Sequence, residues 1–221
     1  MIPIYTICLT PNEYGKFDLI ISIVAFLVPI VSLQLEQVVF RFIFYDNSSK
    51  NKILGEAITL VTIGIGVLTI LLLPLYNRID YYGYIWLIIV SQCYYQLFKE
   101  YLRGTGKVDL YTLINIVNII IIFIFNWIFV VFAKIGIKGL LLSYVVSYSI
   151  CSLFMIFKER INIEIQIDKK MQKKMLDFSI PLIPNTVAFW IINLSDRFLI
   201  NYYIGEYYNG LYAIACKIPT L

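Results

Sequence analysis

The chain has 221 residues, of which 60% are hydrophobic and 14% charged, and its formal net charge is +4. A soluble domain carries about 25% charged residues to keep its surface hydrated, so this composition excludes an ordinary soluble protein. The absence of histidine excludes histidine-based catalytic triads and histidine metal sites. Basic residues are not interleaved with aromatic residues on a polar module. We therefore expect neither a nucleic-acid partner nor a cofactor.

Apolar blocks recur along the chain, each about 18–25 residues long, which is the length that crosses the hydrocarbon core as a helix. Strict two-residue alternation is not seen, so helices rather than strands are expected to cross the bilayer. The sequence therefore predicts an all-α, polytopic transmembrane helical bundle. In chain order, residues 1–10 form the tail of a truncated helix, and a last partial span begins at Tyr207. The complete spans between them are Phe17–Leu35, Ile53–Tyr76, Tyr81–Phe98, Leu110–Phe132, Ile137–Phe157 and Phe178–Ile204.

Lysine and arginine are distributed unevenly between the two sets of loops. Most of them fall in 41–52, 99–107 and 158–174, whereas the other set contains only Lys16, Arg78, Lys134 and Lys138. By the positive-inside rule the first three loops are cytoplasmic, which places the chain in the inner (cytoplasmic) membrane. The longest loop, 158–174, is either an amphipathic segment on the anionic inner leaflet or a solvated linker.

Residues Thr10–Ile23 resemble residues Ile204–Ile218 when Gly15 is aligned with Gly210. We expect each copy to join the end of one span to the start of the next through a short acidic-aromatic-glycine turn, with both copies on the same side of the membrane. This pattern predicts a parallel repeat of two six-helix halves. The expected domains are a first lobe at 1–157 with a truncated first helix, a basic linker at 158–174, and the start of a second lobe at 175–221. The chain would then be a fragment of a protein about twice as long.

Polar residues form stripes on several predicted helices. Gln34, Gln37 and Arg41 share one face, with Glu36 beside it. Similar stripes are Gln92, Gln96, Lys99 and Arg103; Asn115, Asn118 and Asn126; and Asn185, Asn193, Asp196 and Arg197. Together they predict a shared hydrophilic cavity. Two alternatives stay open, because the basic residues also suit membrane-interface anchors and the asparagine stripe also suits helix–helix contacts.

Asp196 and Arg197 lie inside an apolar span, where a charge costs at least about 2.5–3.5 kcal/mol and therefore usually faces protein or a water-filled cavity. They form either part of a polar route or a structural pair. Lys217 in the next span is a candidate partner for Asp196 or Asp177. The prolines Pro181 and Pro184 predict a kink at the start of this span.

Four segments resemble the oligosaccharide flippases of polysaccharide biosynthesis, in the multidrug/oligosaccharidyl-lipid/polysaccharide exporter superfamily. They are EYGKF (Glu13–Phe17), LEQVVFRF (Leu35–Phe42), the Pro-rich FSIPLIPN…LSDRFLINYYIG (Phe178–Gly205) and YYNGLYAIACKI (Tyr207–Ile218). The resemblance implies two six-helix halves around a central cavity. It also implies movement of an undecaprenyl-pyrophosphate-linked oligosaccharide from the inner to the outer leaflet. The implied partners are this glycan, the lipid bilayer and polysaccharide polymerase or chain-length proteins.

Within this frame we expect Arg197 and Arg41 to hold the pyrophosphate, because arginine binds phosphate through bidentate, charge-assisted hydrogen bonds. Asn185 and Asn193 would contact the glycan in the cavity. Asp196, Glu36 and Lys217 would tune these charges or couple transport to H⁺ or Na⁺.

Three other functions are alternatives to a flippase. A membrane enzyme such as a polymerase or ligase needs a catalytic outer loop, but the predicted outer loops are short and lack paired carboxylates. A drug or cation exporter of the same superfamily would favour acids over arginines in its cavity. A non-functional truncated remnant is the third possibility.

Overall fold

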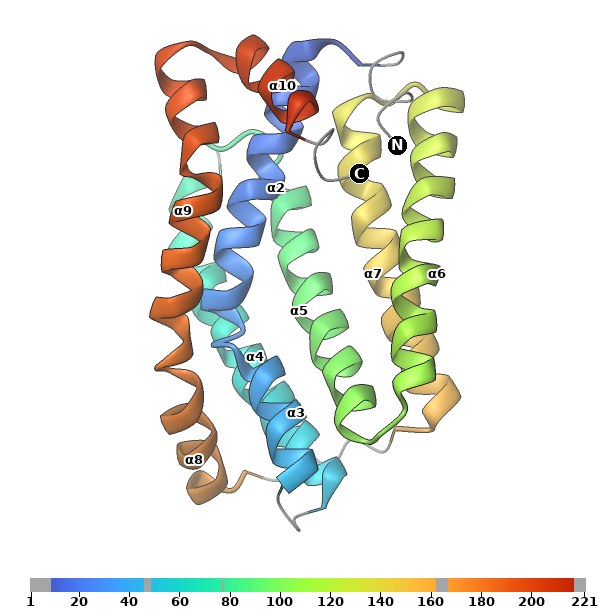
Figure 1. The fold of residues 1–221 in the computed structure, drawn as a ribbon, viewed down its shortest axis with the longest axis vertical. Coiled ribbons are helices and arrows are strands. Elements are labelled where there is room, and N and C mark those ends of the chain that lie inside the picture. The colour runs from blue at the N-terminus through green and yellow to red at the C-terminus, as the bar shows by residue number, and fades with distance from the viewer. Residues whose placement is uncertain (1–8, 46–48, 77, 162–166, 217–221) are drawn as a thin grey trace.

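A computed structural model describes residues 9–45, 49–76, 78–161 and 167–216, and all regular structure in these ranges is helical (Figure 1). This confirms the predicted all-α bundle. Short 3₁₀ and π-helical turns, Leu73–Leu75 and Trp127–Phe132, extend two of the helices. The α-helices are α2 (Pro11–Val31), α3 (Leu35–Tyr45), α4 (Lys50–Leu72), α5 (Tyr82–Gly104), α6 (Val108–Asn126), α7 (Ile137–Glu159), α8 (Lys169–Ser179), α9 (Leu182–Tyr203) and α10 (Glu206–Ala215).

Five helical stretches in the described residues are long and apolar enough to cross a membrane, namely Pro11–Val31, Lys50–Leu72, Val108–Phe132, Ile137–Glu159 and Lys169–Ile192. The protein is therefore a multi-pass membrane protein. Helix α5 is 23 residues long, but its last turns contain Lys99, Glu100 and Arg103. It lies inside the bundle, packed against α3 and α7, with Ile88, Leu97 and Leu102 almost fully buried.

The two ends of the bundle differ in charge. The described parts of the loops 41–52, 99–107 and 158–174 lie with α3 and α8 at one end, which we call the basic end, whereas α10 and the start of α2 lie at the other, the α10 end (Figure 1). Lys52 forms an ion pair with Asp168 at 2.9 Å, and the Arg103 guanidinium lies 4.2 Å from the ring centroid of Phe40. The structure therefore gathers the three predicted basic loops on one side.

Helix α2 begins six residues earlier than predicted. The side chain of Thr10 accepts a hydrogen bond from the Glu13 N–H at 3.3 Å, and Glu13 Oε2 accepts one from the Thr10 N–H at 2.9 Å. This capping box, with Pro11 at the first helical position, starts the helix. Gly15 is consequently helical, and Gly210 likewise lies inside α10. The predicted position of the turn was wrong, because the acidic-aromatic-glycine residues of both copies are helical; each copy does contain the start of a helix, as expected.

The predicted span Phe17–Leu35 is interrupted. Helix α2 ends at Val31, and the chain turns through Leu33 and Gln34, whose φ angles are +51° and +56°, before α3 begins at Leu35. Pro29 lies just ahead of this break and cannot donate a helical hydrogen bond. A break of this kind inside a membrane bundle exposes backbone groups, which is tolerated where protein or a cavity surrounds them.

A second break separates α8 from α9. Helix α8 ends at Ser179, and α9 begins at Leu182 after Ile180 and Pro181. The predicted span Phe178–Ile204 is thus two helices, and Phe178 belongs to α8. The predicted linker 158–174 is also partly helical, since α7 continues to Glu159 and α8 starts at Lys169.

The asparagine stripe of α6 connects helices rather than lining a cavity. Asn126 Oδ1 accepts a hydrogen bond from Ser143, Asn118 Oδ1 accepts one from Ser147, and Asn115 Oδ1 accepts one from the Tyr95 hydroxyl. Both serines lie on α7 and are fully buried. The alternative of helix–helix contacts is therefore confirmed for these asparagines.

Close packing of α4 on α2 depends on Gly64. A Cβ atom at this position would lie 2.2 Å from the backbone oxygen of Val31, whereas one at Gly66 would meet nothing within 4 Å. We expect Gly64→Ala to destabilise the protein by about 1–3 kcal/mol because the two backbones must separate. Gly66→Ala should leave stability unchanged or slightly raised, since alanine favours the helix. Thermal unfolding of the two variants in detergent measures the difference, and equal melting temperatures would contradict this packing.

Candidate functional site

A cavity of about 780 Å³ opens at the basic end between α3 and the junction of α8 and α9. Helix α3 and the turn before it contribute one wall, and the first turn of α9 contributes the other. The lining residues are Gln34, Gln37, Phe40, Arg41, Tyr45, Phe178, Leu182, Asn185 and Thr186. Both helix breaks described above therefore border this cavity.

Arg41 is the one charged side chain among these described lining residues. Its guanidinium lies 4.3 Å from the ring centroid of Phe178, a cation–π contact that joins α3 to α8. Stacking on an aromatic face leaves the N–H groups of arginine available to bind an anion. The amides of Gln34, Gln37 and Asn185 surround this cation with donors and acceptors suited to hydroxyl-rich ligands.

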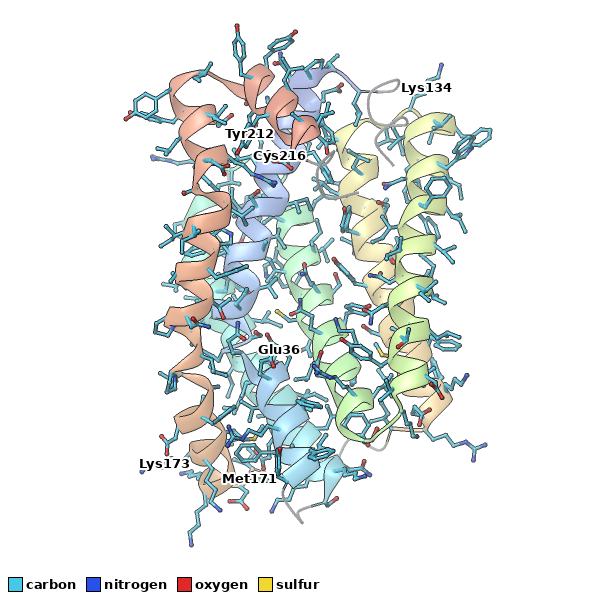
Figure 2. The ribbon with its side chains drawn as sticks, viewed as in Figure 1. Glu36, Lys134, Met171, Lys173, Tyr212 and Cys216 are labelled. Atoms are coloured by element: carbon cyan, nitrogen blue, oxygen red, sulfur yellow. The ribbon has the colours of Figure 1, made fainter. Side chains whose placement is uncertain are left out.

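Glu36 and the polar stripe of α5 are not among the lining residues of this cavity. The Glu36 side chain is buried between α3 and α5, where its nearest charged neighbours are Lys99 and Glu100 (Figure 2). Lys99 lies 5.5 Å from the ring centroid of Tyr95, and Arg103 is paired with Glu100 at 3.3 Å. The expectation of one cavity shared by four polar stripes was therefore wrong: the α3 stripe lines it, and of the described residues of the α9 stripe only Asn185 does.

A second polar cluster lies nearer the α10 end. The Arg197 guanidinium donates to Asp18 Oδ1 at 3.1 Å and to Ser22 Oγ at 3.2 Å. The two charged side chains are only 20% and 7% exposed. This buried pair joins α9 to α2, two helices far apart in the sequence. It offsets the cost of placing an arginine within the membrane bundle.

The same face of α2 makes further contacts with α9. The Trp190 indole N–H donates to the Ser22 carbonyl at 2.9 Å, and the rings of Trp190 and Phe26 are 4.4 Å apart. Asp18, Ser22 and Phe26 are spaced by four residues and therefore lie on one helical stripe. This stripe holds α9 along much of the length of α2.

Helix α10 packs closely against α2 through two glycines. A Cβ atom on Gly15 would lie 2.1 Å from the carbonyl oxygen of Glu206, and one on Gly210 would lie 2.1 Å from that of Pro11. The contact is reciprocal, because 195 residues separate both Gly15 from Gly210 and Pro11 from Glu206. Two related segments that contact each other in this way are arranged about a local two-fold axis.

Asp196 does not pair with Arg197. Its Oδ2 accepts a hydrogen bond from the Tyr212 hydroxyl on α10, and its Oδ1 accepts one from the backbone N–H of Arg197. Tyr212 lies at the α10 end (Figure 2). The structural-pair interpretation was wrong, because each charged group has a partner on a different helix.

The predicted site residues thus separate into two groups. Arg41 and Asn185 line the cavity, whereas Arg197 lies twelve residues beyond Asn185 in α9, a rise of about 18 Å along the helix. In this conformation the two arginines do not surround one ligand. The side chain of Asn193 and all of Lys217 lie outside the described residues.

Sequence reasoning missed Asp18 and Trp190. Asp18 was an acid inside a predicted span, four residues from Ser22, and its position alone marked it as a candidate partner for a buried cation. Trp190 had no comparable signal, because an aromatic residue in an apolar helix is most often ordinary packing.

The family described as "Polysaccharide biosynthesis protein" matches the chain over residues 1–221. No curated protein and no solved structure matches it.

The buried pair between Asp18 and Arg197 makes a quantitative prediction. Asp18→Asn or Arg197→Gln alone should destabilise the protein by about 3 kcal/mol, because each removes the opposite charge that offsets the burial of the other, and the double variant should lose less than the sum. Thermal or denaturant unfolding in detergent gives the coupling energy. The exposed pair Lys16–Glu206, at 3.5 Å, serves as the control and should couple by less than about 1 kcal/mol. Additive effects of Asp18→Asn and Arg197→Gln would contradict the pairing.

Proposed function

Because the chain belongs to the polysaccharide biosynthesis protein family, we propose that it moves an oligosaccharide linked to undecaprenyl pyrophosphate across the cytoplasmic membrane. The family and the multi-pass bundle support a role in the export of lipid-linked polysaccharide. The pyrophosphate and the attached sugars are the parts that need a polar route, since the lipid tail can stay in the hydrocarbon.

The cavity at the basic end is the observation that carries this proposal. One arginine beside three aromatic and four uncharged polar side chains suits an anionic group attached to sugars. By the positive-inside rule the basic end faces the cytoplasm, where lipid-linked precursors are assembled. The cavity would therefore receive its substrate from the inner leaflet.

The opposite end supports an alternating-access mechanism. The Asp18–Arg197 pair and the Gly15–Gly210 contact hold α9 and α10 against α2. The protein would be open to the cytoplasm and closed at the outer surface. For release, α9 and α10 would move away from α2, with the breaks at Leu33–Gln34 and Ile180–Pro181 as the flexible points.

A transporter also accounts for the cavity better than the other candidates. Neither a carboxylate pair nor a nucleophile with an adjacent base is found among its described lining residues, and an enzyme would need one of these. A drug or cation exporter would place acids there, but the charged lining residue is Arg41.

Arg41 provides the direct test. In cells that depend on this gene for surface polysaccharide, Arg41→Gln should lower glycan export by at least about tenfold, because a charge-assisted hydrogen bond to phosphate is lost. Glycan export by Arg41→Lys should lie between that of the unmodified protein and that of Arg41→Gln, since lysine keeps the charge but not the bidentate geometry. Export is measured as surface glycan at matched protein level in the membrane.

Arg160→Gln is the matched control, because the exposed Arg160 follows α7 at the same end and is not among the lining residues of the cavity. It should export normally. Unchanged export by Arg41→Gln would exclude Arg41 from substrate binding. Loss of cationic drug resistance instead of glycan export would favour the exporter alternative.

A further inference from the structure

Helix α8 is amphipathic, with an apolar inner face and a strongly basic outer face. Met171 and Met175 are buried, and α8 packs against α3 and α4. Four exposed lysines lie on the same two turns, namely Lys169, Lys170, Lys173 and Lys174. Among the ion pairs of the described residues, none involves these four lysines. Their positive charges are therefore exposed on the surface of the basic end.

The position of α8 is fixed by a buried carboxylate on α4. Glu56 is fully buried and accepts hydrogen bonds from the Asp168 backbone N–H and from Gln172 Nε2, both at 2.7 Å. The Asp168 side chain caps α8 and pairs with Lys52 at 2.9 Å. This pairing lowers the pKa of the Asp168 carboxyl, so Asp168 stays ionised and engaged with Lys52 at neutral pH. These contacts hold α8 against α4, so the lysines project from a fixed helix and not from a flexible linker.

The depth of the helix places these lysines at the membrane surface. Helix α8 forms the first part of the apolar stretch Lys169–Ile192, so its lysines lie at one end of that stretch, and α9 follows after two residues. Lys173 lies in the first turns of that stretch, at the basic end of the bundle (Figure 2). The lysines therefore lie about where phospholipid headgroups meet a membrane helix. Within α8 the one exposed acid is Asp177, so the face keeps a net positive charge.

We propose that the lysine face of α8 binds anionic phospholipid headgroups in the leaflet at the basic end. Clusters of basic residues next to a membrane helix attract anionic lipid, each lysine strengthening binding by about fivefold. The cavity is a separate feature, since its lining includes Phe178 from α8 but none of the four lysines. This inference does not depend on which molecule the cavity carries.

Native mass spectrometry of the purified full chain with equal amounts of phosphatidylglycerol and phosphatidylcholine tests the proposal. The unmodified protein should retain phosphatidylglycerol preferentially. Changing the four lysines together to glutamine should lower that preference by at least about tenfold. Changing them to arginine should keep it, because the charge remains. The control variant Lys134→Gln/Lys138→Gln removes two exposed charges at the α10 end and should behave like the unmodified protein.

Two results would overturn the proposal. One is an unchanged phosphatidylglycerol preference in the four-glutamine variant, provided that its melting temperature shows it to be folded. The other is displacement of the bound phosphatidylglycerol by low-millimolar inorganic phosphate, which would assign the face to free anions rather than to headgroups.

Discussion

An arginine inside a membrane bundle needs a partner of opposite charge. The pairing of Arg197 with Asp18 determines how α9 packs against α2, two helices that lie far apart in the sequence. The pair lies on a stripe of α2 that also contains Ser22 and Phe26, and α9 packs along it. Removing either charge would take away the opposite charge that offsets the burial of the other in a medium of low dielectric. The pair therefore specifies which face of α9 turns toward α2, and hence which face lies near the cavity.

The reciprocal contact of Gly15 and Gly210 adds to this closure at the α10 end, because two helices can approach this closely only without a Cβ. At the basic end, beyond the two helix breaks, α3 and α8 contact each other and border the cavity beside Arg41. Helix α2 is thus joined to α9 and α10 by close backbone packing and a buried ion pair toward the α10 end, whereas a polar cavity opens beside α3 and α9 at the basic end. This asymmetry is what an alternating-access transporter shows in one of its two states.

The positions of the helices and the residues that share a helix face were predictable because both depend on local sequence. Hydropathy located the helices, and three-to-four-residue spacing placed Gln34, Gln37 and Arg41 on one surface. The same spacing did not show that Glu36 faces α5, since only packing decides that. Asp196 and Arg197 are adjacent and so project from a helix about 100° apart, which is why each found a different partner. The partner of Arg197 is 179 residues away, beyond any local pattern.

The central claim is that the protein is open at the basic end and closed at the α10 end. Labelling with a membrane-impermeant maleimide tests it, using single cysteines at position 185 in the cavity and position 22 behind the ion pair. The background would lack Cys8, Cys93, Cys151 and Cys216. We expect Asn185→Cys to react from the cytoplasmic side alone and Ser22→Cys from neither side. Labelling of either cysteine from the outer side would contradict the account.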